Sequence, residues 1–201
     1  MNEKKLSKSA DKKLRTKDLI YAGAFGAIYL VLTMIIVLGS AMIPILYILS
    51  PLIVGAVCGS VYMLCVVKVH KFGSALILGI LFSLVCCSAS VPGLVAAIVC
   101  ALLAELIIFL GKYKSKCMYL ISFVVFNLNM ACPFMMLIYA KDAFLDRAAS
   151  YYGDAYRESL SGLMPDWIFL GLVALAIAGG ILGSAIAGKL SKKHFEKAGV
   201  V

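Results

Sequence analysis

Charged residues are scarce in this chain, and their scarcity excludes an ordinary soluble domain. Asp, Glu, Lys and Arg make up 14% of the 201 residues, whereas about a quarter is usual in soluble globular proteins. Hydrophobic residues make up 63%, and the mean hydropathy is +1.02. This composition predicts an integral membrane protein, and the length suits one compact membrane domain.

The chain also lacks the side-chain combinations that intramembrane enzymes need. Both histidines, His70 and His194, lie at the ends of apolar runs, and only one carboxylate, Glu105, lies well inside a run. An acid and a base that share a proton therefore cannot be assembled within the membrane. No glycine-rich phosphate-binding motif is present either. We expect neither catalytic activity nor a bound cofactor.

Metal and nucleic-acid sites are excluded on similar grounds. None of the seven cysteines forms a C-x-x-C pair, and neither histidine is spaced from a cysteine as a zinc ligand would be. Most of the cysteines are interpreted as reduced, small apolar side chains, with a redox role left open for the adjacent Cys86 and Cys87. The net charge of +9 comes without an Arg-rich or aromatic-interleaved stretch, so nucleic acid is not an expected partner.

Long apolar runs dominate what is present. A membrane-spanning helix needs about 20 apolar residues, and the sequence predicts an all-α protein with six transmembrane helices at 19–38, 43–67, 72–88, 91–111, 117–140 and 165–188. The membrane domain then covers residues 19–188, between an N-terminal tail, 1–18, and a C-terminal tail, 189–201. The first run is too long for a signal peptide and is interpreted as an uncleaved span.

The distribution of basic residues predicts the orientation of these helices. Six crossings place 16 of the 19 Lys and Arg on one side, in the two tails and two short connections. The three others, Lys141, Arg147 and Arg157, lie in the connection 141–164 on the opposite side. Because basic residues accumulate on the cytoplasmic side of a membrane protein, both termini are predicted to be cytoplasmic.

The outer connection, 141–164, is the longest one and has its own pattern. It is acidic overall, and apolar and aromatic residues recur at helical spacing from Leu145 to Leu160. This spacing predicts one amphipathic helix. Its tyrosines could form an interfacial aromatic belt or a lid over a pocket that opens outward.

Three polar side chains lie well inside the predicted spans, where such groups are costly. Glu105 has three readings: a hydrogen bond between helices, a proton-coupling carboxylate or a contact with a partner protein. Asn127 and Asn129 precede Pro133, which interrupts helical hydrogen bonding. A broken, polar stretch at mid-membrane is typical of binding sites, and hydrogen bonding between helices explains it equally well.

Small residues form rows on the first and last spans. Ala22 and Gly26 are four residues apart, as are Gly23 and Ala27, so each pair shares one side of a helix. The last span has two longer rows, one at Ala176, Gly180, Ser184 and Gly188 and one at Gly179, Gly183 and Ala187. Such rows let helix backbones approach closely. The two spans could pack on each other, or the rows could dock another membrane protein.

In layout, the chain resembles the substrate-binding S components of energy-coupling factor (ECF) transporters. The segments KDLIYAGAFGAIYLVL near the start and GSAIAGKLSKKHFEKAGVV at the end are similar to the Trep_Strep family of S components inferred from sequence. The resemblance implies a vitamin-like small molecule bound in an outward-facing pocket. It also implies docking of the first helix on a transmembrane T component that two cytoplasmic ATPases drive.

In that family the docking motif is Ala-x-x-x-Ala. Here it corresponds either to Ala22 and Gly26 or to Gly23 and Ala27, so the resemblance assigns the docking role to one of these two rows. On this basis Gly26→Leu would block docking without unfolding the protein. The residues expected to bind substrate are Asn127, Asn129, Tyr139, Tyr152, Tyr156 and Trp167, and the tyrosine-rich acidic loop favours an aromatic or cationic ligand. The alternatives are a stand-alone secondary transporter that uses Glu105 for ion coupling, and a non-transport membrane scaffold that binds no small molecule. Membrane lipid is an expected partner in every case.

Overall fold

The computed structural model describes residues 14–113 and 115–190, so most of both predicted tails lies outside the described residues. Every regular element described is helical. In chain order these are α1 (Thr16–Ala41), α2 (Pro44–Val69), α3 (Ser74–Cys86), α4 (Val91–Leu110), α5 (Lys116–Asn127), the 3-10 helix η2 (Leu128–Met135), α6 (Met136–Tyr139), α7 (Lys141–Tyr152), α8 (Asp154–Leu163) and α9 (Ile168–Leu190).

Five apolar segments of the described chain are long enough to cross a membrane, and the third predicted span is shorter than expected. The five are α1, α2, α4, the continuous segment Lys116–Tyr139 and α9. In place of a span over 72–88, α3 has 13 residues, or about 20 Å at 1.5 Å per residue, against about 30 Å of hydrocarbon. The turn at Gly73 and the end of the helix at Cys86 account for the difference.

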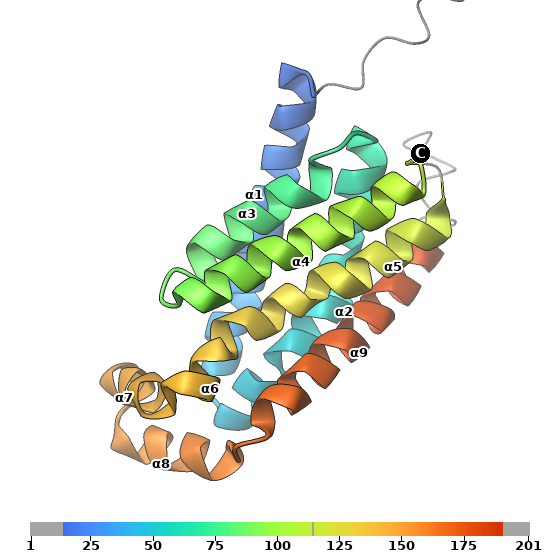
Figure 1. Ribbon diagram of the computed structural model, residues 1–201. Helices are drawn as coiled ribbons and strands as arrows, with labels where there is room; N and C mark the ends of the chain where they lie inside the picture. The colour runs from blue at the N-terminus through green and yellow to red at the C-terminus, as the bar shows by residue number, and fades with distance from the viewer. Residues whose placement is uncertain (1–13, 114, 191–201) are drawn as a thin grey trace, which may run out of the picture.

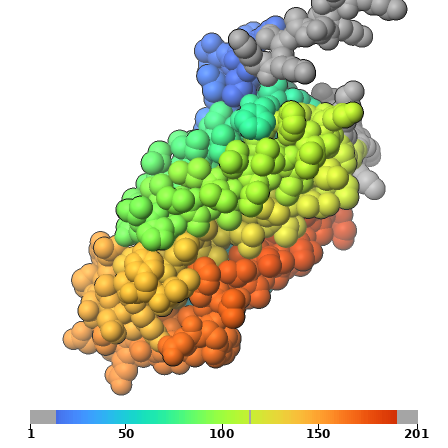
Figure 2. All heavy atoms as spheres, in the orientation of Figure 1, coloured from blue at the N-terminus to red at the C-terminus, as the bar shows by residue number. Residues whose placement is uncertain are grey.

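The helices form a bundle with two distinct ends (Figure 1). The start of α1 and the end of α9 lie at one end, here called the basic end, with the α2–α3 and α4–α5 connections. The α7–α8 hairpin covers the opposite end, here called the capped end, as one continuous block in Figure 2. Helix α2 packs against both α1 and α9, and α4 packs between α3 and α5. Of the two alternatives left open for the small rows, mutual packing of the first and last spans is not what the bundle shows, because α2 lies between α1 and α9.

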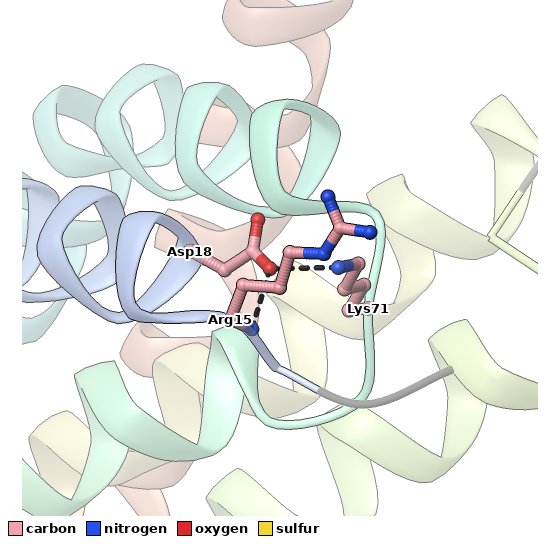
Figure 3. A network of polar contacts seen from close by, with 3 residues as sticks. All are labelled: Arg15, Asp18 and Lys71. Carbon is pink, nitrogen blue, oxygen red and sulfur yellow. Dashed lines mark hydrogen bonds and ion pairs between the residues drawn. The ribbon is translucent and has the colours of Figure 1, made fainter. Parts of the chain in front are cut away.

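Local capping follows the sequence closely at two helix starts. Pro92 lies in the first turn of α4, and the Ser90 hydroxyl accepts a hydrogen bond from the Gly93 N–H at 3.1 Å. At the start of α1, the Asp18 carboxylate accepts the Arg15 N–H at 2.8 Å and contacts the Lys71 ammonium at 2.7 Å (Figure 3). Asp18 thus ties α1 to the α2–α3 connection.

The fifth span changes helix type halfway along. Helix α5 ends at Asn127, and eight residues of 3-10 helix follow, with Pro133 among them. Proline lacks the N–H that an α-helix would use, and its ring crowds the carbonyl of residue i−4, so the chain leaves the α-helical conformation around it. The interruption expected from Pro133 is therefore present.

The outer connection forms two helices, so the prediction of a single amphipathic helix was wrong. Gly153 separates α7 from α8 with φ of +87°, a conformation that side chains other than glycine rarely adopt. The chain folds back there, and Leu145 and Leu160 enter one apolar cluster with Phe134, Leu137, Met164, Ile168 and Leu172. The hairpin is thereby packed onto the ends of η2 and α9.

Glycines hold α2 and α9 at very close range. A Cβ at Gly179 would lie 2.7 Å from the Pro51 carbonyl oxygen, and one at Gly59 would lie 2.8 Å from the Gly183 backbone. On the next face of α9, the Ser184 hydroxyl donates to the Leu120 carbonyl of α5 at 2.8 Å. Both small rows of α9 are thus used inside the bundle, because only backbones without side chains can approach so closely.

Candidate functional site

A cavity opens between α1, α2, α3 and η2 in the half of the bundle nearer the capped end. Its volume is about 210 Å³, and its walls are mostly apolar: Thr33, Met34, Val37, Tyr47, Ser50, Phe82, Val85, Cys86, Met130, Pro133 and Phe134. The interruption of the fifth span brings Met130, Pro133 and Phe134 onto this wall. We call this space the deep chamber.

A second space, the cap chamber, lies between the end of α1 and the α7–α8 hairpin. It measures about 420 Å³ and is lined by Val37, Leu38, Ala41, Tyr47, Phe144, Arg147, Ala148, Tyr151, Tyr152 and Tyr156. Val37 and Tyr47 line both chambers, so the two spaces adjoin at these side chains. We call the two adjoining chambers jointly the Tyr47 cavity, and the cap chamber alone is within the size range of small-molecule sites.

Aromatic rings surround Tyr47 on two sides. Its ring centroid lies 5.2 Å from that of Phe134 in η2 and 6.5 Å from that of Phe144 in α7, the latter nearly parallel at 18°. Tyr152 and Tyr156, whose centroids are 4.7 Å apart, line the same chamber. Such faces provide stacking surfaces for a planar ligand.

The deep chamber contains a hydroxyl group with no partner. Ser50 is fully buried, and among the described residues no group forms a hydrogen bond with its Oγ atom. A buried hydroxyl without a partner is unfavourable by about 1–3 kcal/mol. A ligand that hydrogen-bonds to Ser50 would remove this penalty, as the few polar groups of small-molecule sites typically do.

Charge and protonation differ between the chambers. Arg147 is the only charged residue on the described walls of the cavity, and it lies at the cap. Burial raises the pKa of Tyr156, and the neighbouring Tyr152 raises it further. The Tyr156 hydroxyl therefore remains protonated at neutral pH and is available as a donor.

Of the six residues predicted to bind substrate, only Tyr152 and Tyr156 line the Tyr47 cavity. Asn127 instead connects three helices, because its Nδ2 donates to the Pro51 carbonyl of α2 at 3.2 Å and to the Ala176 carbonyl of α9 at 2.7 Å. For Asn127 the structure thus supports the interhelical role.

The other three residues lie elsewhere. Asn129 is fully buried, and neither amide atom has a hydrogen-bond partner within the described chain. The Tyr139 hydroxyl lies 2.7 Å from Ser90 Oγ and holds α6 against the start of α4. Trp167 is 65% exposed just before α9, in a position typical of interfacial aromatic residues.

The sequence patterns did not indicate four residues that line the cavity, namely Tyr47, Ser50, Phe134 and Arg147. A hydroxyl directly before Pro51 in an apolar run was the available signal for Ser50, and it is a weak one. Tyr47 and Phe134 lie within apolar runs that have the pattern of ordinary membrane-spanning helices. Their convergence depends on how α2 and η2 pack, which no local pattern reveals.

Glu105 belongs to α4, and its side chain reaches the first turn of the neighbouring helix α3. The carboxylate is fully buried, and its Oε2 accepts the N–H groups of Ala75 and Leu76, in the first turn of α3, at 2.8 and 3.1 Å. Tyr113 donates its hydroxyl to Oε1 at 2.9 Å. Burial and the carboxylate itself raise the pKa of Tyr113, which keeps this donor protonated. Glu105 therefore supplies acceptors to N–H groups that α3 leaves unpaired.

Glu105→Ala is expected to destabilise the folded protein by about 3 kcal/mol, because it strands two N–H groups and a phenol in a buried site. Glu105→Gln is the matched control, since its amide oxygen still accepts both N–H groups. Thermal unfolding of the detergent-solubilised variants would measure the difference. Equal unfolding midpoints for the two variants would contradict this role.

The two small rows of α1 have different surroundings. Ala22 and Gly26 face inward, and a Cβ at Gly26 would lie 2.7 Å from Leu81 Cδ1 of α3. A Cβ at Gly23 would meet no atom within 4 Å, and Ala27 is exposed. Of the two rows proposed for docking, the bundle uses Ala22 and Gly26 itself and leaves Gly23 and Ala27 open.

Comparison with known proteins finds one family. The model of a family described as a hypothetical bacterial integral membrane protein (Trep_Strep) matches residues 16–197. No curated protein and no solved structure matches the chain.

Proposed function

Because the chain belongs to the Trep_Strep family of bacterial integral membrane proteins, we propose that it is the substrate-capturing S subunit of an ECF-type importer. It takes up a vitamin-like small molecule at the capped end and docks on a T component with two cytoplasmic ATPases. The basic end faces the cytoplasm in this proposal, in accordance with the distribution of Lys and Arg.

The Tyr47 cavity is the observation that carries the proposal. It is bordered by the α7–α8 hairpin, lined by aromatic side chains and contains one unpaired, buried hydroxyl at Ser50. An integral membrane scaffold without a ligand has no need of such a space. A small-molecule site needs an apolar cavity with a few convergent polar groups.

The walls of the cavity favour one ligand chemistry over another. The tyrosine and phenylalanine rings suit a planar ring, as the tyrosine-rich loop had indicated. The charge on the wall is that of Arg147, which disfavours a cation and favours a ligand with an anionic group, such as a carboxylate. An aromatic or heteroaromatic acid is therefore the preferred class.

In this proposal the chain needs partner proteins to power uptake, because it contains no energy-coupling site of its own. The sequence contains no nucleotide-binding motif. The alternative of a stand-alone, ion-coupled carrier needs a titrating group near its substrate, and its one candidate, Glu105, caps α3 away from the cavity walls. The open row on α1, Gly23 and Ala27, is the surface offered to the T component.

The test is a tagged pull-down from the native membrane in mild detergent, with the co-purifying proteins identified by mass spectrometry. We expect a transmembrane T protein and two ATPases. Recovery of this chain alone, from cells whose ECF module is expressed and intact, would refute the proposal. Uptake by the isolated protein in vesicles, blocked by Glu105→Gln, would establish the ion-coupled carrier instead.

Ser50→Ala is expected to weaken binding of the ligand identified by screening about fivefold to tenfold, because one hydrogen bond is worth about 1 kcal/mol. The unliganded protein should unfold at the same temperature or higher, since a buried, unpaired hydroxyl is removed. Ser74→Ala is a matched control, because Ser74 Oγ is likewise buried without a partner in the described chain but lies at the start of α3. Equal affinities for the two variants would exclude Ser50 from the site.

A further inference from the structure

A second cavity lies at the basic end, and the proposed capture of a small molecule does not use it. It measures about 600 Å³ and is formed by the α2–α3 connection and the end of α4. Its lining residues are His70, Lys71, Phe72, Phe109, Leu110, Lys112 and Tyr113. Two lysines and two phenylalanines therefore meet in one depression.

The backbone around this cavity is held in an unusual conformation. His70, Lys112 and Tyr113 have φ of 48°, 51° and 55°, and in the described chain they are the residues other than glycine with positive φ. This region is unfavourable for residues with a Cβ atom and persists where surrounding contacts enforce it. All three line the same cavity.

Specific hydrogen bonds enforce the turn after α4. The Tyr113 N–H donates to the Ile108 carbonyl at 3.3 Å, and the Tyr113 hydroxyl donates to Glu105. The Tyr119 hydroxyl donates to the Tyr113 carbonyl at 2.7 Å. The position of Lys112 at the rim is thus built by the fold and does not depend on a freely moving loop.

Positive charge predominates at the rim. Lys71 is held by Asp18 at 2.7 Å, and Figure 3 shows the Arg15 guanidinium on the same side of that carboxylate. Among the residues that line the cavity, Lys71 and Lys112 carry positive charge, and Lys112 is exposed. Burial lowers the pKa of His70, so the imidazole is neutral at pH 7 and contributes hydrogen bonding, not charge.

The remaining wall is apolar and open to the surroundings. The rings of Phe72 and Phe109 meet edge to face at 6.1 Å, and Phe109 and Leu110 are 55% and 74% exposed. Exposed apolar side chains at the end of a membrane-spanning helix lie against lipid. Cationic side chains therefore adjoin a lipid-facing apolar surface. This arrangement matches a phospholipid, whose charged headgroup would lie at the cations and whose acyl chains would lie along the apolar surface.

We propose that this cavity binds an anionic phospholipid, with the headgroup phosphate at Lys71 and Lys112 and the acyl chains along Phe72, Phe109 and Leu110. Phosphate is the chemistry recognised, and the apolar wall favours a lipid over a free phosphate ion. Basic pockets on the cytoplasmic side of membrane proteins bind such headgroups. A bound lipid would anchor the α2–α3 connection, and with it Asp18 and the start of α1, at the membrane surface.

The experiment is native mass spectrometry of the full-length protein in detergent, titrated with phosphatidylglycerol or with phosphatidylcholine. Lys112→Gln is the test variant, because Lys71 also supports α1 through Asp18. Lys189→Gln is the control, with the same loss of charge at an exposed position near the same end of the bundle but outside the cavity. A third arm adds inorganic phosphate as a competitor, and thermal unfolding verifies that both variants are folded.

Tighter binding of phosphatidylglycerol than of phosphatidylcholine is expected for the unmodified protein. Lys112→Gln should weaken phosphatidylglycerol binding about fivefold and Lys189→Gln by less than about twofold, since one basic residue near anionic lipid contributes on the order of 1 kcal/mol. Equal binding of the two lipids would overturn the proposal, as would equal effects of the two variants. Displacement of the lipid by inorganic phosphate would also overturn it and would assign the site to a free anion.

Discussion

Gly183→Ala in α9 is expected to destabilise the protein by about 3 kcal/mol or more, which would lower its folding equilibrium constant about 100-fold or more. The added methyl group would overlap the Gly55 carbonyl of α2 and lie 2.8 Å from Phe123 Cε1. Backbone atoms cannot move aside as a flexible side chain can, so α2 and α9 must separate along their crossing. Overpacking of this kind costs about 1–3 kcal/mol even where side chains can adjust.

The measurement is thermal unfolding in detergent, followed by size-exclusion chromatography of the tagged protein. Gly188→Ala is the matched control on the same helix, because its Cβ would make an ordinary contact with Leu120 at 3.7 Å. Alanine also favours the helix over glycine, so this variant should be as stable as the original protein or more so. Similar unfolding of both variants would show that the crossing tolerates side chains and would contradict the packing described.

Gly23→Leu is expected to reduce recovery of the T component and ATPases about tenfold or more while leaving the protein folded. A Cβ at Gly23 would meet no atom within 4 Å outside its own stretch of α1, so the bundle leaves room for a side chain there. A partner helix seated in that groove would be displaced, and a loss of 1.4 kcal/mol already lowers affinity tenfold. This prediction depends on the proposed function.

Two further variants separate docking from folding. Gly26→Leu, first expected to block docking alone, instead tests the packing of α1 on α3, because Gly26 faces Leu78 and Leu81. It should lower the unfolding temperature. Val95→Leu in α4, another exposed apolar position, should change neither stability nor recovery. Normal recovery of the complex with Gly23→Leu would exclude this face of α1 from the interface.

Much of the secondary structure could be predicted from local sequence. Apolar length identified five long spans, Ser90 and Pro92 marked the start of α4, and Pro133 marked the interruption of the fifth span. The third span was overestimated, because the apolar run continues through turns on both sides of α3. The two helices of the outer hairpin were predicted as one, because apolar residues recur at helical spacing on both sides of Gly153 without a break in the pattern.

By itself, the sequence determined that this protein lies in a membrane, where its five long apolar segments lie and which residues are small enough for close packing. These properties follow from composition, run length and residue size, which are local. The tertiary structure alone decided how side chains distant in sequence are used. Glu105 caps a helix that begins about 30 residues earlier, and the row of Ala22 and Gly26 turns inward while the row of Gly23 and Ala27 stays open. Tyr47 and Ser50 likewise meet η2 around a cavity. The physical reason is the same for all of these contacts. In a bundle, the neighbours of a side chain depend on how the helices are packed and rotated, and sequences with the same apolar runs can pack in different ways.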